Sequence, residues 1–299
     1  MPAPFLMLGA ALLFSLMGLC VKLASSQYSP SEILLVRSLV GVALLLGLAR
    51  WRGVALGTRL PWMHVWRGVI GVAALLLWFW AIAGLPLATA MTLNQMSAIW
   101  MALFLLGGAI LLGGKSLDPR LIVAVLVGFI GVALVLQPTF ARDQLPWGLA
   151  GLASGMLAAM AYLQVTALGR AGEPEIRVVF YFSLAGVVAA GLLSLFTPAP
   201  PRPQGHSLVG MGLLLAVGVS ATLAQVLMTA AYARGKVLAN ASLNYSGIVF
   251  SALLGWLVFD EAPGWLALLG MLLIVGAGLT ATLLRSHQAK DLPSDAHNE

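Results

Sequence analysis

Lys22 and Arg37 are the ionisable residues that we place inside long apolar runs of this chain. A charged side chain within a lipid bilayer is costly, and it typically faces a functional cavity or a partner inside the protein. Near the end of such a run, however, the side chain can extend its charged group to the membrane surface. Both interpretations stay open here. We take Lys22 and Arg37 as candidate charged residues that gate or line a cavity.

Neutral polar and aromatic side chains form a second candidate set, expected at mid-depth in the same runs. Amide groups can hydrogen-bond a carboxylate or an amine without the strong attraction of a full charge pair. Aromatic rings can line a cavity, although ordinary packing between helices also uses them. The residues that we predict to line a substrate cavity are Trp78, Trp80, Asn94, Gln95, Trp100, Tyr162, Gln164, Gln225, Asn244 and Tyr245.

No residue pattern in the chain indicates catalysis or a resident metal. We expect the four histidines (His64, His206, His287 and His297) in connections or in the C-terminal tail, and the sequence holds no HExxH motif. We also expect no Asp or Glu inside an apolar run. The sequence therefore predicts a protein that is not an enzyme and that uses no cofactor.

The composition is that of a membrane protein. Charged residues make up 9% of the 299 residues, whereas soluble domains have about 25%. An apolar helix of about 20 residues can cross a bilayer. We therefore predict an all-α membrane protein with ten transmembrane helices, at residues 4–24, 32–49, 66–83, 88–112, 120–136, 147–168, 176–196, 207–231, 238–259 and 264–284.

The positive charges predict the orientation of these helices, since Lys and Arg are enriched in cytoplasmic connections. With a cytoplasmic N-terminus, the outer connections hold Lys22, Arg142 and Arg202. The inner connections then hold Arg50, Arg52, Arg59, Arg67, Lys115, Arg120, Arg170, Arg177, Arg234, Lys236, Arg285 and Lys290. We predict that both termini are cytoplasmic, with residues 285–299 as a polar tail. The net charge of +6 then reflects topology and does not indicate nucleic-acid binding.

A short phrase occurs twice in the sequence. The segment GLPLATAMTLN at 84–94 is repeated as GKVLANASLN at 235–244, and six of ten aligned positions are identical when one residue is skipped. Two five-helix halves, 1–137 and 147–284, are therefore predicted. Because five is odd, the second half must enter the membrane in the opposite direction, as in transporters with inverted repeats. We expect the two phrases to act as hinges, one at each mouth, although tight helix packing would use the same small residues.

The segment from Val21 to Gly41 and the doubled phrase resemble the drug/metabolite transporter superfamily, in particular its ten-helix EamA-like group. The resemblance rests on Lys22, on Pro30 and Arg37 early in the second helix, on the small residues that open the fourth and ninth helices, and on Glu261. Within this group the chain looks most like a bacterial exporter of aromatic amino acids of the YddG type. One departure is the GGKSLDP segment at 113–119, where an acidic residue equivalent to Glu261 is often found.

The resemblance and the repeat together imply a transporter that works by alternating access through a central cavity. We expect export of amino acids, aromatic or otherwise neutral, across a bacterial inner membrane. The alternatives are an exporter of drugs or other polar metabolites and, with less support, a channel or a structural subunit. Besides the substrate and the bilayer we expect no partner, and we expect the protein to be a monomer or a loose homodimer. With no buried carboxylate or histidine expected, we also predict flux without obligatory proton coupling.

Overall fold

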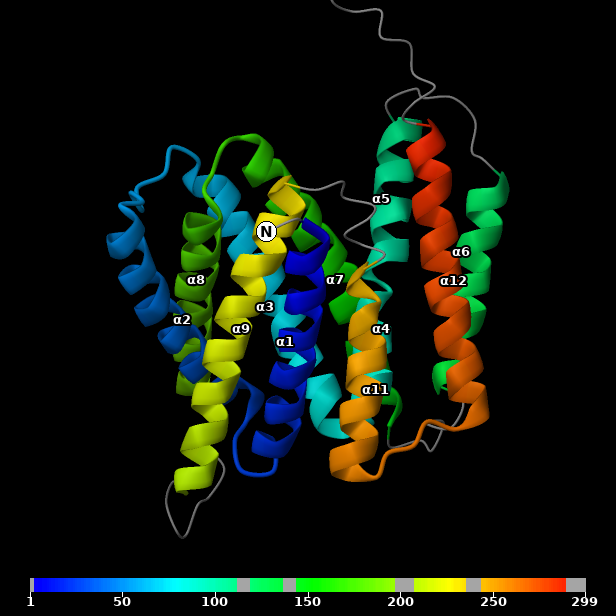
Figure 1. Ribbon diagram of the computed structural model, residues 1–299, viewed down its shortest axis with the longest axis horizontal. Coiled ribbons are helices and arrows are strands. Elements are labelled where there is room, and N and C mark those ends of the chain that lie inside the picture. The colour runs from blue at the N-terminus through cyan, green and yellow to red at the C-terminus, as the bar shows by residue number, and fades with distance from the viewer. Residues whose placement is uncertain (1–2, 112–118, 137–143, 197–206, 235–242, 289–299) are drawn as a thin grey trace, which may run out of the picture.

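The fold is a bundle of α-helices (Figure 1). The computed structural model describes residues 3–111, 119–136, 144–196, 207–234 and 243–288, and all regular structure within these ranges is helical. The helices are α1 (Ala3–Ala24), α2 (Pro30–Arg52), α3 (Pro61–Gly84), α4 (Leu87–Gln95), α5 (Ser97–Leu111), α6 (Pro119–Leu136), α7 (Leu145–Arg170), α8 (Glu175–Phe196), α9 (Leu208–Arg234), α11 (Ser246–Phe259) and α12 (Trp265–Gln288).

Six of these helices are long and apolar enough to cross a bilayer, namely α1, α2, α3, α7, α8 and α9. The predicted fourth span is not one continuous helix, because α4 ends at Gln95 and α5 begins at Ser97. Residues 238–242 of the predicted ninth span lie outside the described residues. The chain is therefore a helical multi-pass membrane protein, while the number of ten spans stays a prediction.

Local sequence explains where the helices start and stop. Ser29 and Glu32 form a capping box at the start of α2, in which each side chain accepts a hydrogen bond from the other residue's backbone N–H. Gly53 ends the same helix with φ of 64°, a left-handed conformation that suits glycine. Pro61 begins α3 five residues before the predicted start at 66, since proline lacks a backbone N–H and is well placed in the first turn of a helix. His64 therefore belongs to a helix and not, as predicted, to a connection. Arg67, whose charge we counted with the inner connections although the predicted span began at 66, lies inside the same helix.

Helices from the two parts of the chain pack against one another in pairs. The pairs are α1 with α9, α3 with α7, α2 with α8, and α6 with α12. The α6–α12 contact is close, since a Cβ added at Gly131 would lie 2.8 Å from the carbonyl oxygen of Gly270. In Figure 1, α5, α6 and α12 stand together on the right of the bundle, and α2 and α8 lie on the left. This interlocking brings α4 and α11 side by side at the centre.

Candidate functional site

A small cavity lies where α1, α3, α4, α7, α8, α9 and α11 meet. Six of the predicted substrate-binding residues line it: Trp78, Asn94, Gln95, Tyr162, Gln225 and Asn244. Its volume is about 60 Å³, enough for a few water molecules. A metabolite can therefore occupy this cavity only after the surrounding helices move apart.

Two amide side chains join the centre of the bundle across the cavity. Gln95, the last residue of α4, donates from Nε2 to the backbone carbonyl oxygen of Asn244 at 2.9 Å, and the Asn244 side chain donates from Nδ2 to Gln95 Oε1 at 2.8 Å. Both residues are buried, and each lies next to a helix break, at Met96 and at Tyr245. Interrupted helices that meet near the middle of the bundle are typical of substrate sites in transporters with repeats.

The asparagine ends of the two copies of the doubled phrase lie at the central cavity, whereas we predicted both copies at the mouths. Asn94 lines the cavity and donates to Ser154 Oγ at 3.0 Å, so the first copy ends at the centre of the bundle and not at a mouth. Asn244, which ends the second copy, also lines the cavity. Residues 235–242 of the second copy lie outside the described residues. A hinge at two opposite mouths is therefore wrong for the asparagine ends of these phrases, which converge on one site.

Arg67 is the charged residue of this site, and sequence reasoning missed it. The residue is 3% exposed and lines the cavity. Its guanidinium carbon lies 4.2 Å from the centroid of the Phe182 ring. Gly71, one turn further along α3, leaves the space that the guanidinium occupies, because a Cβ there would lie 1.8 Å from Nη1. Among the described residues, Arg67 Nε and Nη1 have no hydrogen-bond partner. A group from outside the chain can supply one.

Arg37 is buried beside the same aromatic ring. Its guanidinium carbon lies 5.0 Å from the Phe182 centroid, and its Nε has no hydrogen-bond partner among the described residues. Arg37 does not line the cavity in this conformation. The side chain is 3% exposed, so the alternative in which it extends to the membrane surface does not hold.

Lys22 lies at the end of the bundle where α1 stops. Its ammonium pairs with Glu261 and also donates to the Leu85 carbonyl oxygen at 2.9 Å. Glu261 in turn accepts a hydrogen bond from the backbone N–H of Leu87 at 3.0 Å, at the start of α4. This cluster therefore ties α1 and the corner before α4 to the connection before α12. The cluster lies at the end of the bundle where α1 stops, and this end is at the bottom of Figure 1.

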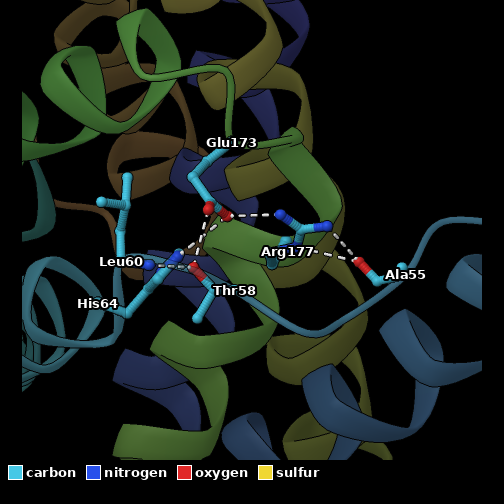
Figure 2. Close-up of polar contacts among 6 residues, drawn as sticks. All are labelled: Ala55, Thr58, Leu60, His64, Glu173 and Arg177. Carbon is cyan, nitrogen blue, oxygen red and sulfur yellow. Dashed lines mark hydrogen bonds and ion pairs between the residues drawn. The ribbon is translucent and has the colours of Figure 1, made fainter.

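A second polar cluster lies at the opposite end of the bundle. Figure 2 shows the Glu173 carboxylate facing three groups: Thr58 Oγ1 at 2.8 Å, Arg177 Nη1 at 3.0 Å and His64 Nε2 at 3.2 Å. Arg177 also donates twice to the Ala55 carbonyl oxygen, at 3.0 and 2.6 Å. Glu173 lies in the turn between α7 and α8, and Ala55 and Thr58 lie between α2 and α3. The cluster therefore links the two parts of the chain, and His64 is buried inside it.

Opposing influences act on the Glu173 carboxyl. Burial raises its pKa, whereas hydrogen bonds from Thr58, Arg177 and His64, together with the charge of Arg177, lower it. The donors prevail, and the pKa of Glu173 lies below its ordinary value. The carboxylate is consequently ionised at neutral pH and holds its partners as an acceptor.

The other predicted site residues lie away from the cavity. Trp80 is 43% exposed on the outside of α3, so its prediction as a cavity residue is wrong in this structure. Trp100 packs in an aromatic group with Phe104 and Phe129. Gln164 and Tyr245 each keep one buried oxygen without a partner among the described residues, but neither lines the central cavity.

The sequence profile of the EamA-like transporters matches residues 1–137 and 145–283. The chain belongs to the EamA-like transporter family. It is therefore a membrane transporter and not an enzyme. Each matched stretch contains one copy of the doubled phrase, and each supplies residues to the central cavity.

Individual relatives differ in the substrates that their names give. The chain is 36% identical over 272 residues to the pseudopaline exporter CntI of Pseudomonas aeruginosa, covering 90% of this chain and 91% of the relative. It is 28% identical to a riboflavin transporter of Vibrio cholerae, covering 90% and 89%, and 25% identical to an S-adenosylmethionine uptake transporter of Rickettsia bellii, covering 75% and 73%. A solved crystal structure superimposes with a TM-score of 0.66 at 25% identity, covering 94% of this chain and 97% of the other. The family thus defines a transporter of small molecules, and the substrate must be argued from the site.

Proposed function

We propose that this EamA-family protein exports a small metabolite that carries a carboxylate, such as an amino acid, and that Arg67 binds the carboxylate. The observation that carries the proposal is the Arg67 guanidinium, which faces the central cavity with Nε and Nη1 unpaired among the described residues. A guanidinium presents a fork of donors that matches a carboxylate. An unpaired charge held away from water is costly, so a site of this kind favours an anionic ligand.

The other polar groups of the cavity suit the rest of such a substrate. The amide oxygen of Gln225 is buried without a partner among the described residues, and the indole N–H of Trp78 is in the same situation. An acceptor and a donor of this kind can bind an amine and a second polar group of the substrate. The lining also contains Phe14, Leu75 and Met91, which suit an apolar substrate side chain. The expected neutral amino acids satisfy these contacts of the closed cavity, in which Arg37 takes no part.

The arrangement of the contacts supports alternating access. Two polar clusters close opposite ends of the bundle, and the Gln95–Asn244 pair closes the cavity between them. Release of one end at a time would expose the cavity first to one side of the membrane and then to the other. We infer a bacterial inner membrane location with both termini in the cytoplasm, on the distribution of Lys and Arg.

The direction of transport is proposed from the relatives. A relative at 36% identity is named an exporter, whereas the relative named for uptake is 25% identical. Export is therefore the direction that we propose. The narrower expectation of aromatic amino acids rests on resemblance and on the aromatic residues of the lining.

Flux measurements on reconstituted protein test the role of Arg67. Purified protein in liposomes is assayed with radiolabelled leucine and phenylalanine and with the corresponding amides, which lack the carboxylate. A hydrogen bond to a charged group contributes about 1.5–3 kcal/mol, so Arg67→Gln should reduce amino-acid flux at low substrate concentration by about 10- to 100-fold. Arg67→Lys should retain part of the flux, and the exposed Arg50→Gln should change nothing.

The outcome for the amides decides the interpretation. Wild-type protein should move the amino acids faster than their amides, and Arg67→Gln should remove that difference. Equal flux of acid and amide in the wild type, or full flux of the acids in Arg67→Gln, would contradict the proposal.

A further inference from the structure

Phe182 brings two buried arginines together from two helices. Arg37 of α2 and Arg67 of α3 place their guanidinium carbons 5.0 and 4.2 Å from the centroid of this one ring. We propose that Arg37, Phe182 and Arg67 form a two-anion site, which makes the transporter selective for metabolites that carry two carboxylates. The inference deepens the proposed function, on which it rests, because it adds a second anionic group to the substrate that Arg67 binds.

Arg37 and Arg67 bring two positive charges into the interior of the bundle. Both arginines are 3% exposed. The carboxylates that the structure describes lie elsewhere, in connections or in the first turn of a helix: Glu32, Glu173, Glu175, Asp260 and Glu261. Among the described residues, no carboxylate forms an ion pair with Arg37 or Arg67. Two positive charges are therefore held inside the bundle without compensation from the described chain.

The aromatic ring does not account for these two charges. A cation over an aromatic face gains much less than an ion loses when it leaves water without a partner. Phe182 does lie against both guanidinium groups, and its ring also lines the cavity beside Gly71. The ring is therefore a positioning residue, and an anion is needed to offset the charge of the two guanidiniums.

The number of anionic groups follows from the positions of the two arginines. Arg67 reaches the cavity, and Arg37 lies against the same ring without lining the cavity in this closed conformation. A single carboxylate on Arg67 would leave the second positive charge uncompensated and close to the first. A substrate with two carboxylates separated by a few carbon atoms would neutralise both. Once the cavity opens, Arg37 thus becomes the residue that distinguishes a dicarboxylate from a monocarboxylate.

Matched pairs of small acids test this inference by binding to the purified, full-length protein. The probes are L-glutamate with L-glutamine, L-aspartate with L-asparagine, and succinate with succinamate, each pair differing in one carboxylate. Dissociation constants are taken from the rise in Tm with probe concentration, since a ligand that binds the folded state alone raises Tm. In the wild type we expect at least one dicarboxylate to bind about 10-fold or more tightly than its monoamide, as for one added charged contact.

Two variants of Arg37 separate a role in specificity from a role in folding. In the wild type the monoamide should have a larger dissociation constant than the dicarboxylate. Arg37→Gln should reduce the ratio of these two dissociation constants to about one while the monocarboxylate still binds, since one charged contact is lost. Arg37→Lys keeps the charge and should retain part of the ratio. Arg67→Gln should weaken both members of each pair. Arg50→Gln, an exposed arginine on the same helix, is the matched control and should leave the ratio unchanged.

Each result bears on the proposal. If no dicarboxylate binds more tightly than its monoamide in the wild type, the two-anion site is wrong. The same holds if Arg37→Gln keeps the full ratio. Binding of monocarboxylates that depends on Arg67 would then leave the proposed function intact. Absence of Arg67-dependent binding for every probe would overturn both.

Discussion

Replacing Glu173 with glutamine should open the end of the bundle that its carboxylate closes. The Glu173 carboxylate now accepts hydrogen bonds from Thr58, His64 and Arg177. In Glu173→Gln the negative charge is lost, and an N–H₂ group, which is a donor, replaces one of the two acceptor oxygens. The Glu173 side chain is 5% exposed and that of Arg177 is 16% exposed, so water cannot fully replace the lost contacts. The substitution therefore destabilises the conformation in which this end is closed, relative to the conformation in which it is open.

The size of the effect can be worked out from the contacts. Removing one partner of a fully buried ion pair costs about 3–5 kcal/mol. Arg177 is partly exposed and keeps its two hydrogen bonds to Ala55, so we expect a smaller cost of about 2–3 kcal/mol. That free energy shifts the ratio of closed to open protein by about 30- to 160-fold. A protein that is mainly closed at this end would become measurably open.

Thiol labelling measures this shift. A cysteine is introduced at Ala161, a buried residue that lines the cavity, after the native Cys20 has been replaced by alanine. A membrane-impermeant maleimide is then added from the side that bears Glu173. We expect Glu173→Gln to raise the labelling rate by about the population shift given above, and Arg170→Gln, which alters an exposed charge at the end of α7, to have no effect. Unchanged labelling in Glu173→Gln would show that the cluster does not hold this end closed.

The same cluster predicts a specific pH dependence. The pKa of Glu173 is lower in the folded protein than its ordinary value of 4.5. A carboxyl with a lowered pKa contributes its full stabilisation above the ordinary value and loses it as the pH falls through the lowered one. The labelling rate itself follows the thiolate fraction of the introduced cysteine, so the rate in wild-type protein is divided by the rate in Glu173→Gln at the same pH. This ratio should be constant between about pH 7 and 8 and should rise toward one below about pH 4.5, as the Glu173 carboxylate is protonated.

Two further substitutions probe the cavity. Gln95→Leu removes two hydrogen bonds, one to the backbone carbonyl and one from the side-chain amide of the buried Asn244. Because an unsatisfied buried polar group costs about 1–3 kcal/mol, we expect a lower Tm and slower flux in liposomes. Wild-type flux in this variant would reduce the amide pair to a packing contact. Gly71→Ala places a Cβ where the Arg67 guanidinium now lies, 1.8 Å from Nη1, so it should impair flux as strongly as Arg67→Gln. Gly47→Ala, with nothing within 4 Å of the added Cβ, is its control, and equal flux in the two alanine variants would refute the steric argument.

The sequence predicted the positions of the helices well, because long apolar runs are the main signal of membrane-spanning segments. The start of α3 is an instructive exception. Residues 61–65 precede the apolar run and contain His64, so the sequence suggested a connection. Arg67, at the edge of the predicted span 66–83, was counted with the charges of that connection. Proline at the first turn was the available signal for an earlier start. With that signal, a buried arginine at the cavity could have been found.

The face of each helix could not be predicted in the same way. Trp78 lines the cavity and Trp80, two residues later on α3, is exposed. In a soluble protein the exposed face of a helix is polar, and the difference marks the buried side. In a bilayer both faces are apolar, so composition gives no such contrast. Residue type alone was enough to select the amide side chains that line the cavity. The partner of Gln95, however, lies 149 residues away in the sequence, and this pairing depends on how the helices pack.

The positions of the buried histidine and of the carboxylates bear on energy coupling. The prediction of flux without obligatory proton coupling rested on the expectation that the helices contain neither a carboxylate nor a histidine. The first premise holds for the interior of the described helices, where Glu32 and Glu175 lie in first turns. The second fails, because His64 is buried in α3 beside Glu173. This histidine nevertheless lies at one end of the bundle, outside the central cavity, and its carboxylate partner already receives two other hydrogen bonds. A proton on His64 would therefore act on the closure of one mouth and would not compete with the substrate for Arg67, which keeps uncoupled flux as our prediction.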